Sequence, residues 1–171
     1  MADRILVVYA SWTGFTQGVA QAVADVLKEN GAEVDVRRIK DAADVGAYHA
    51  VVVGSAVRAG KVNGNAVAFL TKHREALSKM PVAFFIVCMT MKEDTAEHRR
   101  EVEQYLAAVQ AQVPEVKFVD VGLFAGGMDP AKLALPMKLI MKAMKTANGD
   151  FRDWDAIRAW AGTLLPKLTG R

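Results

Sequence analysis

The residues with the clearest chemical potential are consecutive: Ser11, Trp12, Thr13, Gly14, Phe15 and Thr16. Three hydroxyl side chains and one glycine directly precede a predicted helix, and the stretch holds no Lys or Arg. Hydroxyl donors, the free N–H groups of a helix N-terminus and the helix dipole can together bind a phosphate monoester without a counter-charge. The alternative is a Ser/Thr-rich turn and helix cap, which is common between a strand and a helix. The position directly after a first strand favours the phosphate site.

Five short runs predict the strands that must position this loop. They are Arg4–Tyr9, Glu33–Arg38, His49–Gly54, Val82–Cys88 and Val116–Val121. The first, third and fourth are continuous apolar runs, typical of strands buried on both faces. The second alternates Val34 and Val36 with charged residues, which favours a strand near the sheet edge.

Helical periodicity fills the segments between these strands. The predicted helices are Thr16–Glu29, Asn63–Lys79, Thr95–Val113 and Asp153–Leu168. In the first helix an apolar stripe ends at Leu27, and Asn30-Gly31 supplies a left-handed stop. In the last helix we expect one buried face, made of Trp154, Ile157, Ala161, Leu164 and Leu168.

Strands that alternate with helices predict an α/β, doubly wound fold with a parallel sheet and helices on both faces. The chain has 171 residues and no linker, repeat or low-complexity block, so we expect one domain over residues 1–171. Ligands of such folds bind at the carboxyl ends of the strands. The loops after the first, third and fourth strands are therefore the candidates.

The loops after the third and fourth strands contain no acidic residue. The third-strand loop is Gly54–Lys61 and offers Ser55, Ala56, Val57, Arg58, Ala59 and Gly60. The fourth-strand loop offers Cys88, Met89, Thr90 and Met91. The alternative for Lys61 is an ordinary solvated charge on a loop. The alternative for Cys88 is a small hydrophobic side chain that packs in the core.

The pattern Ser-x-Thr-Gly-x-Thr after a first buried strand resembles the FMN phosphate loop of the flavodoxin superfamily. The resemblance implies a flavodoxin-like three-layer sandwich, a five-stranded sheet in the order 2-1-3-4-5, and FMN as cofactor. It makes the third- and fourth-strand loops the two walls of the isoalloxazine site. Arg58 near the pyrimidine end of the flavin would stabilise the anionic reduced form and raise the two-electron potential. Trp12 could flank the flavin or shield the phosphate loop.

Positive charge gathers in the last quarter of the chain. Residues 131–171 contain eight Lys/Arg and three Asp/Glu, whereas residues 1–130 contain 14 and 16. A surplus helix is predicted over Asp129–Lys145, before the closing helix. Within Met137–Lys145, methionines and Ile140 share one face and lysines share another. This segment could pack on the core, or contact a flat apolar anion, a membrane interface or a second subunit.

Three stretches together resemble the menaquinone-dependent protoporphyrinogen IX dehydrogenase family: Gly54–Gly60, Met137–Lys145 and the Asp153-Trp154 pair. The resemblance implies oxidation of protoporphyrinogen IX to protoporphyrin IX, with electrons passed through FMN to a quinone or other respiratory acceptor at the membrane. Residues 124–136 lack the aromatic- and arginine-rich composition expected there, so other substrates stay open. No side chain is assigned as catalytic, because the flavin would carry the hydride chemistry.

Composition excludes several other classes of function. One cysteine rules out an internal disulfide and a cysteine-cluster metal site, and the three histidines have no metal-ligand spacing, so no metal is expected. Pro81–Met91, the longest uncharged apolar stretch, is well short of the ~20 residues that span a bilayer. We expect a cytoplasmic protein, with peripheral contact at the inner face of the cell membrane through Met137–Lys145 as an option. Nucleic acid is disfavoured, since the lysines lack interleaved aromatics. The alternative function is an FMN electron carrier that serves a partner protein.

Overall fold

Five parallel strands form the centre of the molecule. The computed structural model describes residues 3–42, 44–128, 136, 139 and 149–170. The strand order is β2-β1-β3-β5-β6, and every neighbouring pair in this order is parallel. These strands are β1 (Arg4–Ala10), β2 (Glu33–Arg38), β3 (Ala50–Arg58), β5 (Val82–Cys88) and β6 (Phe118–Ala125). The predicted doubly wound fold with a 2-1-3-4-5 order is confirmed.

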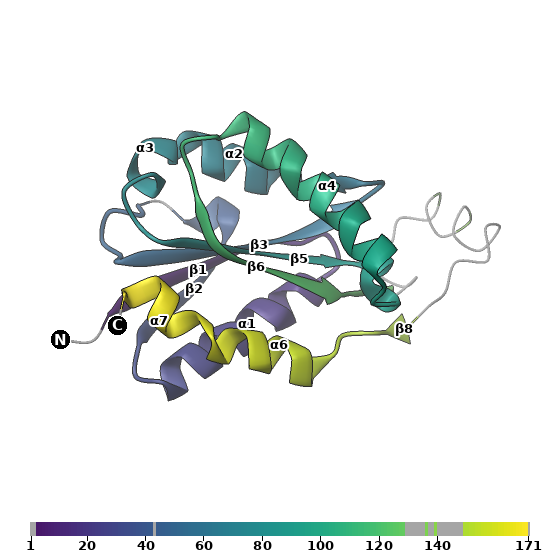
Figure 1. Ribbon diagram of the computed structural model, residues 1–171, viewed down its shortest axis with the longest axis horizontal. Helices are drawn as coiled ribbons and strands as arrows, with labels where there is room; N and C mark the ends of the chain where they lie inside the picture. Colours follow the sequence, from purple (N-terminus) through teal and green to yellow (C-terminus); the bar gives the residue numbers. More distant parts are fainter. Residues whose placement is uncertain (1–2, 43, 129–135, 137–138, 140–148, 171) are drawn as a thin grey trace.

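Helices cover both faces of this sheet (Figure 1). One face carries α1 (Phe15–Glu29), α6 (Trp154–Gly162) and α7 (Leu164–Thr169). The other carries α2 (Gly64–Lys72), α3 (Arg74–Leu77) and α4 (Ala96–Gln112). Short elements complete the described chain: the 3-10 helices η1 (Ile39–Asp41) and η2 (Met89–Lys92), and the strands β4 (Lys61–Val62), β7 (Gly127–Met128) and β8 (Gly149–Asp150).

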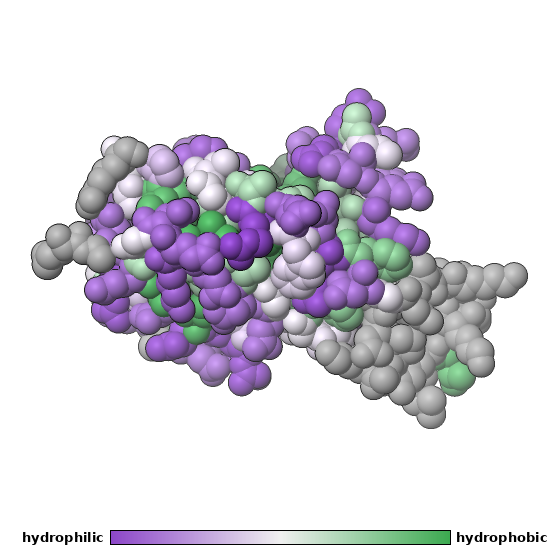
Figure 2. Space-filling view, turned by 90° about the horizontal axis from the view of Figure 1, so that it is seen from below, coloured by the Kyte–Doolittle hydropathy of each residue, from purple (hydrophilic) through white to green (hydrophobic). Residues whose placement is uncertain are grey.

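The core consists of two apolar layers, one on each face of the sheet. Ile5 and Val7 pack toward α1, whereas Leu6 and Val8 belong to the layer under α2 and α4. Every residue of β5 is buried, as expected for a central strand covered on both faces. Figure 2 views the face that bears α1, α6 and α7, where hydrophilic side chains cover most of the described surface.

The stretch predicted as the third-strand loop is largely a β-hairpin. Strand β3 continues through Ser55 to Arg58, and β4 returns antiparallel to it. The turn residues Ala59 (φ 52°) and Gly60 (φ 73°) both adopt left-handed backbone conformations, as in a type I′ turn. The prediction of an irregular loop over Gly54–Lys61 was therefore wrong.

The fifth predicted strand begins too early and ends too soon. The chain turns between Val113 and Val116, because the Val116 N–H donates to the Val113 carbonyl. The Gln110 side chain donates to the carbonyls of both residues and holds the turn. Pairing with β5 then extends the strand to Ala125.

Two predicted helices are each interrupted. The helix predicted over Asn63–Lys79 leaves helical geometry at His73, whose ring packs on Phe69 with 4.7 Å between centroids. The closing helix breaks at Thr163, because Pro166 has no N–H to donate to the carbonyl of Gly162. Trp154, predicted on the buried face, is 40% exposed at the first turn of α6. The other four predicted positions of that face are buried.

Candidate functional site

The predicted phosphate loop lies between β1 and α1, at the carboxyl edge of the sheet. The Ser11 Oγ accepts a hydrogen bond from the Gly14 N–H at 2.8 Å. Gly14 has φ 90° and brings no side chain to cap the helix, which begins at Phe15. The first turn of α1 contains no acidic residue, and Thr16 is fully buried there. Uncapped N–H groups at the positive end of a 15-residue helix suit a phosphate.

The β3–β4 hairpin starts beside this loop. Ala10 at the end of β1 pairs in register with Ser55, which is buried. The Ser55 Oγ accepts from the Asn63 N–H at 3.1 Å and donates to the Ala56 carbonyl at 2.8 Å. Ser55 therefore fastens the base of the hairpin, while Arg58 and the turn extend beyond the sheet.

A stacked pair connects the predicted phosphate loop with the hairpin. The Arg58 guanidinium carbon lies 4.5 Å from the centre of the Trp12 ring. Trp12 is 41% exposed, so its ring forms part of the surface at this edge. The arginine brings positive charge to a loop that has none of its own.

The third predicted segment, Cys88–Met91, joins the last residue of β5 to the first three residues of η2. Met91 is buried, and Met89 and Thr90 are half-buried. Burial raises the pKa of the Cys88 thiol, partly offset by hydrogen bonds from Met91 and Thr90. The thiol is therefore protonated at neutral pH, and packing is its role in the described structure. The Cys88 carbonyl accepts from the Gly126 N–H, which holds the end of β5 to the residue that follows β6.

The sequence model of the flavodoxin domain matches residues 6–155. The chain belongs to the flavodoxin domain family. FMN is the cofactor that membership in this family indicates. Flavodoxin 2 from Bacillus cereus superposes with a TM-score of 0.59 at 18% identity, over 92% of this chain and 94% of that one.

Curated relatives of this flavodoxin domain include dehydrogenases. A Leishmania major protein named protoporphyrinogen IX dehydrogenase [quinone] is 27% identical over 94% of this chain and 74% of its own length. The Escherichia coli K12 protein of the same name is 28% identical over 53% of this chain and 51% of its own. An NAD(P)H dehydrogenase (quinone) of Paraburkholderia phymatum is 29% identical over 39% and 45%. The last two alignments thus span about half of each relative.

Sequence reasoning missed Arg152, which contacts the predicted phosphate loop from 137 residues away. Its Nη1 donates to the Phe15 carbonyl at 3.2 Å, and its guanidinium lies over the rings of Phe15 and Trp154. Asp150 accepts from Nε and Nη2 at 2.8 and 2.6 Å. No local spacing signals this contact, because it depends on the return of the chain to the first turn of α1.

Tyr105 on α4 is a second residue that was missed. Its ring lies beside the hairpin turn, where a Cβ on Gly60 would come within 3.5 Å of Tyr105 Cε1. Its hydroxyl donates to Glu101 Oε1 at 2.5 Å, and this bond raises the pKa of Tyr105. The Tyr105 ring therefore packs against the turn of the hairpin at Gly60.

The surplus basic segment Met137–Lys145 lies outside the described residues, apart from Leu139, which is 60% exposed. Within the part of the chain that the structure describes, no helix has the length and apolarity needed to cross a membrane. The same residues contain no cluster of three metal-ligating side chains.

Proposed function

We propose that the chain binds FMN at the carboxyl edge of the sheet and acts as an FMN-dependent oxidoreductase. Ser11, Thr13, Gly14 and Thr16, with the first N–H groups of α1, would hold the phosphate. Trp12 and Phe15 would border it. The hairpin residues Ser55, Ala56, Val57, Arg58, Ala59 and Gly60 would flank one side of the ring system. Cys88 at the end of β5 and the η2 residues Met89, Thr90 and Met91 would flank the other. The uncapped start of α1 directly after a hydroxyl-rich loop is the observation that carries this proposal.

The bound flavin would supply two-electron redox chemistry, and the protein would tune it. Arg58 is the cation best located for this, because its stack on Trp12 holds the guanidinium at the site. A fixed positive charge favours the anionic reduced cofactor, so it raises the two-electron potential. We expect Arg58→Met to lower that potential and Lys61→Met, at the exposed first residue of β4, to change it less.

For the reaction, we propose oxidation of protoporphyrinogen IX with a quinone as acceptor. The names of the relatives in Leishmania major and Escherichia coli support the substrate and the acceptor. The basic excess in residues 131–171 suits a substrate with carboxylate groups. Each two-electron oxidation of the substrate releases two electrons and two protons, and reduction of one quinone to its quinol consumes them. The exchange is therefore balanced without a further co-reactant.

The first experiment is a titration with FMN followed by absorbance. We expect flavin bands to shift on binding, and Thr13→Val with Thr16→Val to weaken binding strongly. Valine has the shape of threonine without its hydroxyl, so the packing of buried Thr16 is kept. The matched control is Thr71→Val, at an exposed position of α2, which should bind FMN normally. Unchanged affinity in the double variant would refute the phosphate site.

A second experiment separates an enzyme from an electron carrier. Anaerobic protein with FMN is mixed with protoporphyrinogen IX and a soluble quinone, and porphyrin fluorescence is followed against a control without protein. Faster growth of fluorescence supports the dehydrogenase. FMN binding without turnover, together with a populated one-electron-reduced form in a redox titration, would instead indicate a carrier for a partner protein.

A further inference from the structure

A cavity of about 330 Å³ lies along the free edge of β6. Pockets for small molecules start at about this volume. Strand β6 ends the sheet on the side away from β3, so the cavity lies across β5 from the hairpin. Its lining comes from η2, the start of α4, the strand β6 and α6. Both α4 and α6 begin near the carboxyl end of β6 (Figure 1). None of its lining residues belongs to the phosphate loop.

Flat aromatic side chains make up much of the wall. Phe124 and Trp160 meet edge to face, with 5.5 Å between centroids. Gly122 lets both rings lie against the strand, because a Cβ there would come within 2.9 Å of each. Phe151 lies on the other side, under the Lys92 Nζ at 4.5 Å. An edge strand also directs half of its backbone N–H and C=O groups away from the sheet. Such a wall fits a planar ring that carries oxygen acceptors.

The charges of the lining cancel. Lys92 and Arg99 are the cations, and Asp94 and Asp153 are the acids. Asp94 accepts from Arg99 Nε and Nη2 at 2.6 and 2.8 Å, an arrangement that does not involve Nη1. Asp153 accepts from the Ala156 N–H and caps α6. A cavity without net charge but with cationic donors favours a neutral ring with carbonyl oxygens over an anion.

We propose that this cavity binds the ring of a quinone, the acceptor in the reaction proposed above, on which this inference rests. Lys92 and Arg99 would donate to the quinone oxygens, while Phe151 and Trp160 contact the ring. Met91 and Lys92 of η2 line the cavity, and Met91 also belongs to the segment proposed to flank the flavin. The two ligands would thus share η2 as a common wall.

The test uses the FMN-loaded, oxidised protein and 2,3-dimethyl-1,4-naphthoquinone, whose methylated ring carbons do not alkylate a thiol. Binding is measured by equilibrium dialysis, and FMN content by absorbance of the same samples. Ala156, exposed on α6, lines the cavity, so we expect Ala156→Trp to weaken binding by at least about ten-fold, or 1.4 kcal/mol. Ala159→Trp, exposed on the same helix outside the lining, should leave binding unchanged.

Two further arms test the chemistry of the site. Lys92→Met should weaken quinone binding, whereas Lys72→Met on α2 should not. 2-Naphthoate, a flat anion of similar size, should bind more weakly than the quinone. Equal affinities in the Ala156→Trp and Ala159→Trp variants, absence of quinone binding, or tighter binding of 2-naphthoate would each overturn the proposal. Loss of FMN binding is measured separately and would refute the proposed function instead.

Discussion

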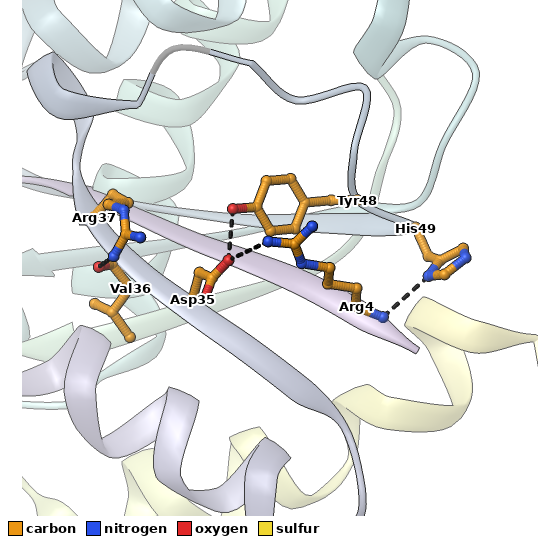
Figure 3. Close-up of polar contacts among 6 residues, drawn as sticks. All are labelled: Arg4, Asp35, Val36, Arg37, Tyr48 and His49. Atoms are coloured by element: carbon orange, nitrogen blue, oxygen red, sulfur yellow. Dashed lines mark hydrogen bonds and ion pairs between the residues drawn. The ribbon is translucent and has the colours of Figure 1, made fainter. Parts of the chain in front are cut away.

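The two ends of the central sheet use arginine–aromatic stacks for different purposes. At the amino end, the Arg4 guanidinium lies 4.8 Å from the centre of the Tyr48 ring and pairs with Asp35 at 3.1 Å. The Tyr48 hydroxyl donates to the same carboxylate oxygen at 2.7 Å, and the Arg4 N–H donates to His49 Nδ1 (Figure 3). At the carboxyl end, Arg58 stacks on Trp12, and among the described residues it forms no ion pair.

This difference separates stability from binding. The amino-end cluster satisfies its charges internally and fastens the edge strand β2 to the segment before β3. The carboxyl end keeps a cation, an uncapped helix start and a left-handed turn, all of which a ligand can use. Changes at the amino end should therefore affect folding alone, whereas changes at the carboxyl end should also affect cofactor affinity.

The largest expected effect comes from Gly127→Ala at the carboxyl end. A Cβ at Gly127 would lie 2.2 Å from a carbon of the Phe15 ring, so Phe15 and the start of α1 must move. Overpacking of this kind costs about 1–3 kcal/mol. We expect the free energy of unfolding, measured with urea, to fall by this amount. We also expect a titration with FMN to show weaker binding.

Gly162→Ala is its control, since a Cβ there meets no heavy atom within 4 Å in the described structure. Replacing a helical glycine by alanine should raise the free energy of unfolding by no more than about 1 kcal/mol. FMN affinity should be unchanged. Wild-type stability and affinity in Gly127→Ala would contradict the tight contact with Phe15.

Arg152→Met against Arg4→Met tests the comparison directly. Each variant loses hydrogen bonds of a charged group, which stabilise a fold by about 1.5–3 kcal/mol each when well shielded. Because both sites are partly exposed, we expect smaller losses from both. Only Arg152→Met should weaken FMN binding, because only Arg152 contacts the first turn of α1. Equal changes of FMN affinity in the two variants would contradict the division between the ends.

Tyr48→Phe should give a smaller, pH-dependent loss of stability. The Tyr48 hydroxyl bond lowers the pKa of Asp35, burial opposes it, and Arg4 adds to the lowering. A carboxyl group with a lowered folded pKa stabilises the fold fully above its unfolded pKa of about 3.9 and loses this contribution as pH falls through the folded value. The loss in Tyr48→Phe should therefore be about 0.5–1.5 kcal/mol at pH 7 and shrink below pH 4.

Urea unfolding of the wild type and of Tyr48→Phe, at pH 7 and again below pH 4, measures this difference in the free energy of unfolding. In an Asp35→Asn background the pH dependence of the Tyr48→Phe effect should vanish. If it persists, another group must be responsible.

The fold was largely predictable because its strands are buried on both faces. Continuous runs such as Val82–Cys88 have few alternatives to a central parallel strand, and burial of the whole of β5 agrees with this. The predicted strand boundaries were wrong where strand pairing sets them, either with a distant strand or within a tight hairpin. Pairing with β5 extends β6 to Ala125, and antiparallel pairing with β4 extends β3 to Arg58.

The candidate site was predictable only where it is local. Ser11–Thr16 is contiguous, so its residue types and their spacing are enough to indicate a phosphate loop. Arg152 reaches the same loop from the end of the chain, and Tyr105 reaches the hairpin from the middle of α4. Tertiary contacts of this kind leave no periodicity in the sequence. The hairpin was missed because Ala59-Gly60 lacks the Asn-Gly signal of a type I′ turn.

The smallest expected effect concerns that turn. Ala59 has φ 52°, a left-handed conformation that costs an L-residue with a side chain about 1–2 kcal/mol. Ala59→Gly relieves this strain, but the unfolded chain gains entropy, so the net gain should be no more than about 1 kcal/mol. Ala108 is exposed in the interior of α4, so Ala108→Gly should instead lower the free energy of unfolding by about 1 kcal/mol.

Thermal unfolding distinguishes the two substitutions by the sign of the shift in Tm. A loss in Ala59→Gly equal to that in Ala108→Gly would mean that Ala59 bears no such strain. If Ala59→Gly is more stable and yet binds FMN more weakly, the strained turn serves to hold Arg58 against Trp12. The carboxyl end would then sacrifice stability for binding in a way that the satisfied cluster at the amino end does not.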